Sequence, residues 1–366
     1  MKSLVCVPLE MQGSSAAVPQ PQPGQDVYVA VDLSRSKWVY GVRWGGQPQR
    51  TVSSPAGLPH LQALIAVYRQ CRLHVVYEAC GFGYEIAWWL EEQGIDGMVI
   101  APSRLERVPG RRVKTDRLDV RSMGRKREQE QLKGIYVPRR AEHERRQLSR
   151  TYAQALKECK RARVRVRSLL QEQGRIGPVP RAGWAVYQQW LAAQALPASV
   201  QLCVRELLQM RQAAVGSARH LKAAILEWAA APEYAPVVAA LEQQPGVGTF
   251  TAIRLVLELG DIRRFATVGA IVNYVGFTPS QYSSGELDQR GHICKAGPGY
   301  LRAWLLQCAW AAIRGKNADL ELKYCFERLV GRVGRKRAIV AVARRLAVRL
   351  RARWLEAVAA AVAVAA

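Results

Sequence analysis

The sequence is short of acidic residues for its length, and this shortage restricts the partners the protein can have. The 366 residues contain 29 Asp and Glu against 54 Lys and Arg, so the formal net charge is +25. Such an excess indicates a polyanionic partner, because each phosphate that a protein neutralises releases condensed counterions. Nucleic acid meets this requirement, and an anionic membrane surface is the competing interpretation.

Three other absences narrow the class of protein. No run approaches the ~20 apolar residues that a bilayer-spanning helix needs, so we expect no membrane segment. The first residues lack a basic stretch followed by an apolar core, so we expect no signal peptide. The eight cysteines include no Cys-x-x-Cys pair, and most have apolar neighbours. This predicts reduced core thiols, no structural zinc and a cytoplasmic protein.

The first part of the chain alternates strand and helix patterns. Residues 1–25 are rich in Gln, Pro, Gly, Ser and Ala, which predicts a flexible leader. Strand patterns cover residues 27–31, 37–44, 73–77 and 97–101, and Gly45-Gly46 supplies a hairpin turn. Helical spacing covers residues 58–68 and 84–93. Strands that alternate with helices predict an α/β sheet domain over residues 26–138.

The rest of the chain has helical patterns. One apolar seam follows a 4-3-4-3-4-3 spacing, which is a heptad pattern, through Leu148, Tyr152, Ala155, Cys159, Ala162, Val166 and Leu169. Many Arg and Lys residues cover the other faces, so residues 139–235 predict a basic coiled coil or helical region. Its seam can pair within the chain or with a second protomer. Residues 236–366 predict a mostly helical domain, and the fold class is therefore α/β plus all-α.

Four acids fall at places where they can meet. Asp32 and Glu78 each close a strand, and Asp116 and Asp119 lie three residues apart, which is one face of a helix. Clustered carboxylates repel one another unless a divalent cation neutralises them, and hard oxygen ligands select Mg²⁺ or Mn²⁺. Two such ions can stabilise the entering and leaving oxygens of phosphoryl transfer. The plainer interpretation is that each acid is a solvated turn residue, with Asp116 as a helix cap.

A serine-rich segment and a glycine-rich turn are the other candidates. Residues 278–285 predict a loop, and a serine nucleophile there would need an activating group, for which His292 and Lys295 are candidates. An ordinary turn is the plainer interpretation. Residues 245–249 resemble a helix-hairpin-helix turn, in which the amides of Gly246 and Gly248 can hold a backbone phosphate. A simple connection between helices explains the same pattern.

Several blocks of sequence, in a fixed order, match one known family. They are Val29-Ala30-Val31-Asp32 with Lys37, Tyr77-Glu78-Ala79, Ala101-Pro102-Ser103, Arg112 to Asp119, Tyr136-Val137-Pro138, Pro245-Gly246-Val247-Gly248, Gly276 to Gly285, Lys295-Ala296-Gly297 and Leu301-Arg302. With these blocks the chain resembles the bacterial insertion-sequence transposases that join an N-terminal RuvC-like DEDD domain to a C-terminal serine transposase domain. Two departures are a longer leader and Cys80, where many members have threonine.

The resemblance implies an RNase H/RuvC-like N-terminal domain, a basic coiled-coil linker and a helical transposase domain. It implies that Asp32, Glu78, Asp116 and Asp119 bind Mg²⁺, or Mn²⁺, and that Ser284 attacks DNA to form a covalent phosphoserine, with Ser283 as the second choice. The implied partners are target and donor DNA, a noncoding bridge RNA and further copies of the chain. The chain would form a dimer, and a tetramer in the synapse. The protein would associate with the nucleoid during the reaction. The expected nucleic-acid contacts are Lys114, Arg117, Arg161, Arg165, Gly246, Gly248, Arg290, Lys295 and Arg302.

Two other hypotheses use the same residues differently. A junction-resolving nuclease of RNase H type would hydrolyse DNA with water at the carboxylates, and Ser284 would be only a turn residue. A scaffold that binds RNA or DNA would need neither the carboxylates nor magnesium.

Overall fold

The computed structural model describes residues 20–46, 50–102, 115–178, 183–284 and 287–365. The chain divides into two compact units, residues 1–140 and residues 141–366. Most of the predicted leader lies outside the described residues, and so does Lys114. The predicted helical region and the predicted transposase domain both lie, from residue 141 onward, in the second unit.

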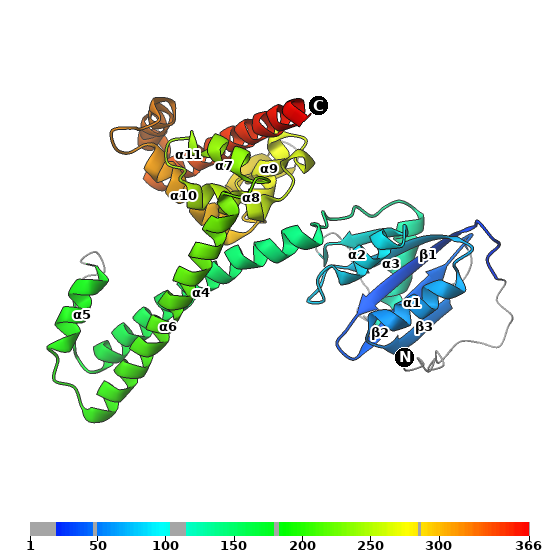
Figure 1. Cartoon of the computed structure of the whole chain (residues 1–366), viewed down its shortest axis with the longest axis horizontal. Coiled ribbons are helices and arrows are strands. Elements are labelled where there is room, and N and C mark those ends of the chain that lie inside the picture. The colour runs from blue at the N-terminus through cyan, green and yellow to red at the C-terminus, as the bar shows by residue number, and fades with distance from the viewer. Residues whose placement is uncertain (1–19, 47–49, 103–114, 179–182, 285–286, 366) are drawn as a thin grey trace. The chain divides into compact units, whose positions relative to one another are not determined.

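The first unit contains a five-stranded mixed sheet with the strand order β3-β2-β1-β4-β5 (Figure 1). Strands β1, β4 and β5 are parallel, whereas β2 is antiparallel to both β1 and β3. The elements are β1 Asp26–Leu33, β2 Lys37–Arg43, β3 Arg50–Pro55, α1 Leu58–Val67, β4 Arg72–Glu78, α2 Glu85–Glu92, β5 Asp96–Ile100 and α3 Asp116–Glu128. The α/β pattern predicted from residue 26 onward is therefore present in the structure.

Each face of this sheet has its own core. Side chains alternate along a strand, so Val29 and Val31 of β1 pack with α1 and α2, whereas Ala30 packs with α3. The α3 core is small and includes Val120 and Met123 from the helix. Alternation in the strands thus decides which residues face α3.

In this unit one strand escaped prediction and one local prediction needs correction. Strand β3 was not predicted, because its sequence is polar and only Val52 and Ser54 are buried. Gly45 and Gly46 do adopt positive φ, but they follow β2 and lead toward β3 rather than joining β1 to β2. The β1–β2 connection is made by residues 34–36, where the amide of Lys37 donates to Ser34 Oγ at 3.2 Å.

The second unit is helical apart from one hairpin. Its elements are α4 Arg140–Glu172, which begins at the last residue of the first unit, α5 Trp184–Ala192, α6 Ala198–Ala229, α7 Ala235–Glu242, α8 Thr249–Leu259, the short 3₁₀ helix η3 Ile262–Arg264, α9 Val268–Val275, β6 Pro279–Ser284, β7 Leu287–Ile293, α10 Gly299–Ala312 and α11 Leu320–Ala365. The predicted loop at residues 278–285 is wrong, because residues 279–284 form strand β6, which pairs with β7.

The predicted heptad seam of α4 finds its partners within the chain. Val166 and Leu170 are buried against Tyr187 and Leu191 of α5 and Val204 of α6. Nearer its start, α4 packs Leu148 and Tyr152 against the main core of the unit. Helices α4 and α6 lie side by side (Figure 1), and residues from both line a shared groove. Both ends of α4 therefore pack against other segments of the same chain.

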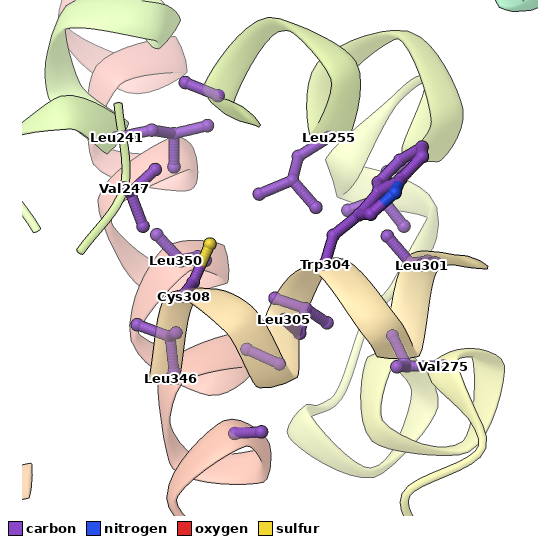
Figure 2. Packing of buried hydrophobic residues seen from close by; sticks show 14 of the residues in the cluster. Leu241, Val247, Leu255, Val275, Leu301, Trp304, Leu305, Cys308, Leu346 and Leu350 are labelled. Atoms are coloured by element: carbon purple, nitrogen blue, oxygen red, sulfur yellow. The ribbon is translucent and has the colours of Figure 1, made fainter. Parts of the chain in front are cut away.

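The main core of the second unit lies among α7, α8, α9, α10 and α11. Figure 2 shows Leu255 of α8, Leu305 and Cys308 of α10 and Leu346 and Leu350 of α11 meeting there. No described helix is both long and apolar enough to cross a bilayer.

The cysteine prediction holds only in part. The described cysteines are free, as predicted, and Cys308 and Cys325 are buried. However, Cys80, Cys203 and Cys294 are exposed, so they are not core thiols. Apolar neighbours in the sequence did not distinguish the two groups, because they do not tell which face of an element is buried.

Candidate functional site

Asp32 and Glu78 lie at the carboxyl ends of two neighbouring parallel strands. The register pairs Val31 of β1 with Tyr77 of β4, so Asp32 and Glu78 are the next residues on adjacent strands. Side chains alternate along a strand, so Asp32 lies on the same face of the sheet as Ala30, and Glu78 lies on the same face as Val76. Ala30 and Val76 both pack in the α3 core. Both acids are half-buried. They therefore project from the α3 face at one end of the sheet.

Asp116 and Asp119 lie in the first turn of α3. The cap of this helix is Thr115, whose side chain accepts a hydrogen bond from the amide of Leu118 at 3.4 Å. Asp116 is therefore not the capping residue, which was its plainer interpretation. Asp116 is exposed and Asp119 is half-buried. Acids in a first turn are also favoured by the helix dipole, so the position alone does not define a role.

The direction of α3 brings its first turn to the end of the sheet that carries Asp32 and Glu78. At the other end of the helix, Glu128 accepts hydrogen bonds from Arg43 and from the amide of Gly46. Arg43 pairs with Tyr28 near the start of β1. Helix α3 thus runs antiparallel to β1, and its start lies at the carboxyl end of that strand.

The four acids consequently share one end of the sheet, yet they do not form a closed ligand set. Among the described residues, no three His, Cys, Asp or Glu side chains lie close enough together to hold a metal ion. The segment that leads into α3, residues 103–114, is outside the described part of the chain. The chemistry of the donors, all carboxylate oxygens, fits Mg²⁺ or Mn²⁺.

A polar cleft of about 270 Å³ opens beside the start of α3. Lys37 and Val39 of β2, residues 51–53 of β3 and Thr115, Asp116 and Arg117 line it. Its lining combines two cationic side chains with hydroxyl groups and one of the four acids. A cleft of this chemistry is suited to a phosphate of a nucleic-acid strand.

Ser284 lies at the tip of the β6–β7 hairpin and is exposed. It pairs in register with Leu287, and the neighbouring Ser283 pairs with Asp288. Because side chains alternate along a strand, Ser283 and Ser284 project from opposite sides of the hairpin. The Oγ of Ser283 accepts a hydrogen bond from Gln281 at 3.1 Å. The two candidate nucleophiles are therefore in different surroundings.

The proposed activators lie at the other end of the same hairpin. The carbonyl of His292 accepts a hydrogen bond from Ser280 Oγ at 3.0 Å, and the amide of Lys295 donates to Gly276. Ser284 lies four residue steps along the extended strand from Ser280, which is about 13 Å. Within one chain, His292 and Lys295 are thus too distant to take a proton from Ser284.

The predicted nucleic-acid residues occupy several settings. Arg161 and Arg165 are exposed on α4, and Arg161 pairs with Glu158. The guanidinium of Arg302 donates to the carbonyls of Val275 and Gly297 at 3.0 and 2.6 Å, so it anchors the base of the hairpin. For Arg290 the backbone is described, as part of β7, and the side chain is not.

The glycine-rich turn joins α7 to α8, as its pattern predicted. A Cβ on Gly246 would lie 2.5 Å from backbone atoms of Cys308 and Ala312, so this glycine allows the turn to pack against α10. Gly248 precedes α8 and has open space around it. A packing role therefore accounts for Gly246, whereas Gly248 remains accessible for a phosphate.

Residues 238–325 match a family model described as Transposase IS116/IS110/IS902 family. The matched segment runs from α7 into α11 and includes the whole β6–β7 hairpin. These findings support an IS116/IS110/IS902 family transposase.

Proteins that carry the name transposase extend the similarity over most of the chain. Two Sinorhizobium fredii proteins named as candidate transposases, y4qE and y4rJ, are each 28% identical; the first alignment covers 78% of this chain and 72% of y4qE, and the second covers 88% and 90%. The Coxiella burnetii transposase for insertion sequence element IS1111A is 35% identical over 27% of this chain and 28% of its own length.

Proposed function

We propose that this transposase cuts and rejoins DNA with Ser284 as the nucleophile, assisted by a magnesium site made of Asp32, Glu78, Asp116 and Asp119. The observation that carries the proposal is the exposed Ser284 at the tip of a hairpin inside the segment that matches the transposase family. A hydroxyl in this position can approach a phosphodiester without rearrangement of the core.

The first unit is proposed to be an RNase H/RuvC-like domain. Its support is the mixed sheet, in which neighbouring parallel strands β1 and β4 end in Asp32 and Glu78, and α3 begins at the same end. The four carboxylates would hold Mg²⁺ or Mn²⁺, which would stabilise charge on the phosphoryl oxygens when bound. The cleft lined by Lys37 and Arg117 would hold a neighbouring phosphate.

The proposed chemistry is a transesterification at phosphorus. The Oγ of Ser284 forms a bond to phosphorus while the bond from phosphorus to one deoxyribose oxygen breaks. The serine proton is lost to a base, and the displaced oxygen gains a proton to become a hydroxyl, so no water or cofactor is consumed. Rejoining reverses these steps with a hydroxyl of a different strand, which frees the serine.

Ser284 and the four acids lie in different units of the chain. We infer that the chain acts as a multimer, in which the serine of one subunit completes the carboxylate site of another. We also propose that a noncoding bridge RNA pairs with target and donor DNA. The net charge of +25 and the exposed basic side chains of α4 support a protein that holds both nucleic acids.

The first experiment replaces Ser284 with Ala in the full-length protein. Recombination is measured with labelled target and donor DNA, Mg²⁺ and a transcript of the noncoding region beside the gene. Ser284→Ala should abolish both strand exchange and the protein–DNA adduct that survives denaturation, while DNA binding stays intact. Ser283→Ala is the matched control and should keep the adduct, because its side chain projects from the other side of the hairpin.

Two other results separate the alternative functions. If Ser284→Ala cleaves DNA at the full rate, the carboxylates act with water and the protein is a nuclease. If Asp32→Asn, or removal of Mg²⁺, leaves every activity unchanged, the protein is a nucleic-acid scaffold and the metal site is not used.

A further inference from the structure

Helix α11 bends at a strongly basic segment beyond the residues that match the transposase family. Gly334 has φ 76° and ψ 159°, which breaks the helical backbone at that point. Exposed cations surround the bend, and we call residues 328–337 the basic elbow. Its cations are Arg328, Arg332, Arg335, Lys336 and Arg337.

The basic elbow carries cations and no acid, and Glu327 is the acid that borders it. From Arg328 to Leu355 the sequence has no Asp or Glu. In the described part of the chain none of the five cations forms an ion pair, and Arg335 has only a distant contact with the ring of Trp310, at 5.9 Å. A solvated helix of an ordinary domain mixes both signs of charge, so this one-sided surface is suited to an anionic partner.

A second glycine, Gly331, lies among the same cations, three residues before the bend. It lies within helical backbone, where glycine is among the least favourable residues. A Cβ at this position would meet no atom within 4 Å, so packing inside the chain does not require glycine there. Gly334 is explained by its positive φ, but Gly331 is not. The missing side chain leaves the helix backbone open to close approach from outside.

We propose that the basic elbow binds the sugar–phosphate backbone of a nucleic acid. The two glycines stand in the sequence Gly331-Arg332-Val333-Gly334, in which only Gly334 departs from helical backbone. The absence of a side chain at both positions would allow phosphates to come close, as glycines do in the Gly-x-x-Gly loop of KH domains. Here the flanking cations would neutralise those phosphates. The inference rests on the proposed function only in taking nucleic acid as the partner.

The test measures binding of the full-length protein to labelled single-stranded RNA, single-stranded DNA and duplex DNA in EDTA, so that no cutting occurs. Gly331→Ala is the sharpest variant, since it leaves the charge unchanged and improves helix propensity. It should weaken binding of at least one of these ligands on the order of tenfold while the thermal midpoint is unchanged or higher. The affected ligand identifies RNA or DNA as the partner.

A pair of double variants controls for total charge. Arg332→Ala with Lys336→Ala should weaken binding to the same ligand on the order of tenfold and reduce its salt slope by about two. Arg205→Ala with Arg219→Ala removes two exposed charges from α6 and should have a much smaller effect. The inference is overturned if Gly331→Ala binds nucleic acid as tightly as the wild type. It is also overturned if Arg205→Ala with Arg219→Ala weakens binding as much as Arg332→Ala with Lys336→Ala. If the wild type binds none of the three ligands, the proposed function itself fails.

Discussion

Asp319 shows how one carboxylate can hold three segments of the second unit together. It accepts hydrogen bonds from the amide of Leu322 at 3.0 Å, from Gln244 at 2.8 Å and from Arg349 at 2.7 Å. Burial acts to raise the pKa of Asp319. The hydrogen bonds from Leu322 and Gln244 and the charge of Arg349 outweigh burial and lower this pKa below its ordinary value of 3.8. The ionised form is therefore the stabilising one.

Asp319→Asn is expected to reduce the free energy of unfolding by about 2 kcal/mol at pH 7, because a charge-assisted hydrogen bond and an ion pair are lost. A lowered folded-state pKa stabilises the fold above the unfolded pKa and ceases to do so as pH falls through the folded value. The difference between wild type and variant should thus shrink below pH 4. Denaturant unfolding at several pH values measures it, with exposed Glu206→Gln as a control of little effect. A difference that stays constant as the pH falls from 7 to the lowest pH at which both proteins fold would contradict this assignment.

At the scale of elements, the packing of α3 against the sheet decides where Asp116 and Asp119 lie. A Cβ on Gly41 would come within 3.1 Å of Val120, so β2 has a glycine where the helix approaches the sheet. Gly41→Val should displace α3 and reduce the free energy of unfolding by about 1–3 kcal/mol, because the added side chain overpacks this contact. If Asp116 and Asp119 serve the proposed metal site, metal-dependent DNA cutting should fall at least tenfold, because catalytic groups tolerate little displacement.

Adding Val120→Ala to Gly41→Val should restore part of the cutting rate, since it returns space to the same contact. Gly216→Val on α6 is the size-matched control, because a Cβ there meets nothing within 4 Å. Cutting assays and thermal unfolding of the four proteins would decide the matter. Full cutting by Gly41→Val would show that the position of α3 is unimportant.

Helices and strands with regularly spaced apolar residues could be predicted from the sequence, whereas strands made mostly of polar residues could not. Strand β1 alternates buried valines with smaller or polar residues and was predicted nearly to its ends. Strand β6 has all six residues exposed, so Ser, Gln and Pro in it resemble a loop, and only its pairing with β7 makes it a strand. The same limit hid β3.

The candidate site was predictable in part for a related reason. The alternation of apolar residues along each strand was enough to place Asp32 and Glu78 at strand ends. That the two acids are adjacent follows only from the register in which β1 pairs with β4. The start of α3 could be placed only once the direction of the helix over the sheet was known. The basic elbow was missed although its signal, two glycines among five cations, is visible in the sequence.

At the scale of the whole molecule, charge sets how binding responds to salt. The net charge of +25 is carried by both units, and α4 and the basic elbow each present exposed cations. If the protein contacts at least six phosphates of duplex DNA, the logarithm of the binding constant should fall with the logarithm of salt concentration at a slope on the order of −5. Anisotropy titrations in EDTA from low to physiological salt give this slope. Replacing Arg161 and Arg165 with Ala should make it shallower by about two if both contact phosphates, and a slope near zero in the wild type would rule out these surfaces as the nucleic-acid interface.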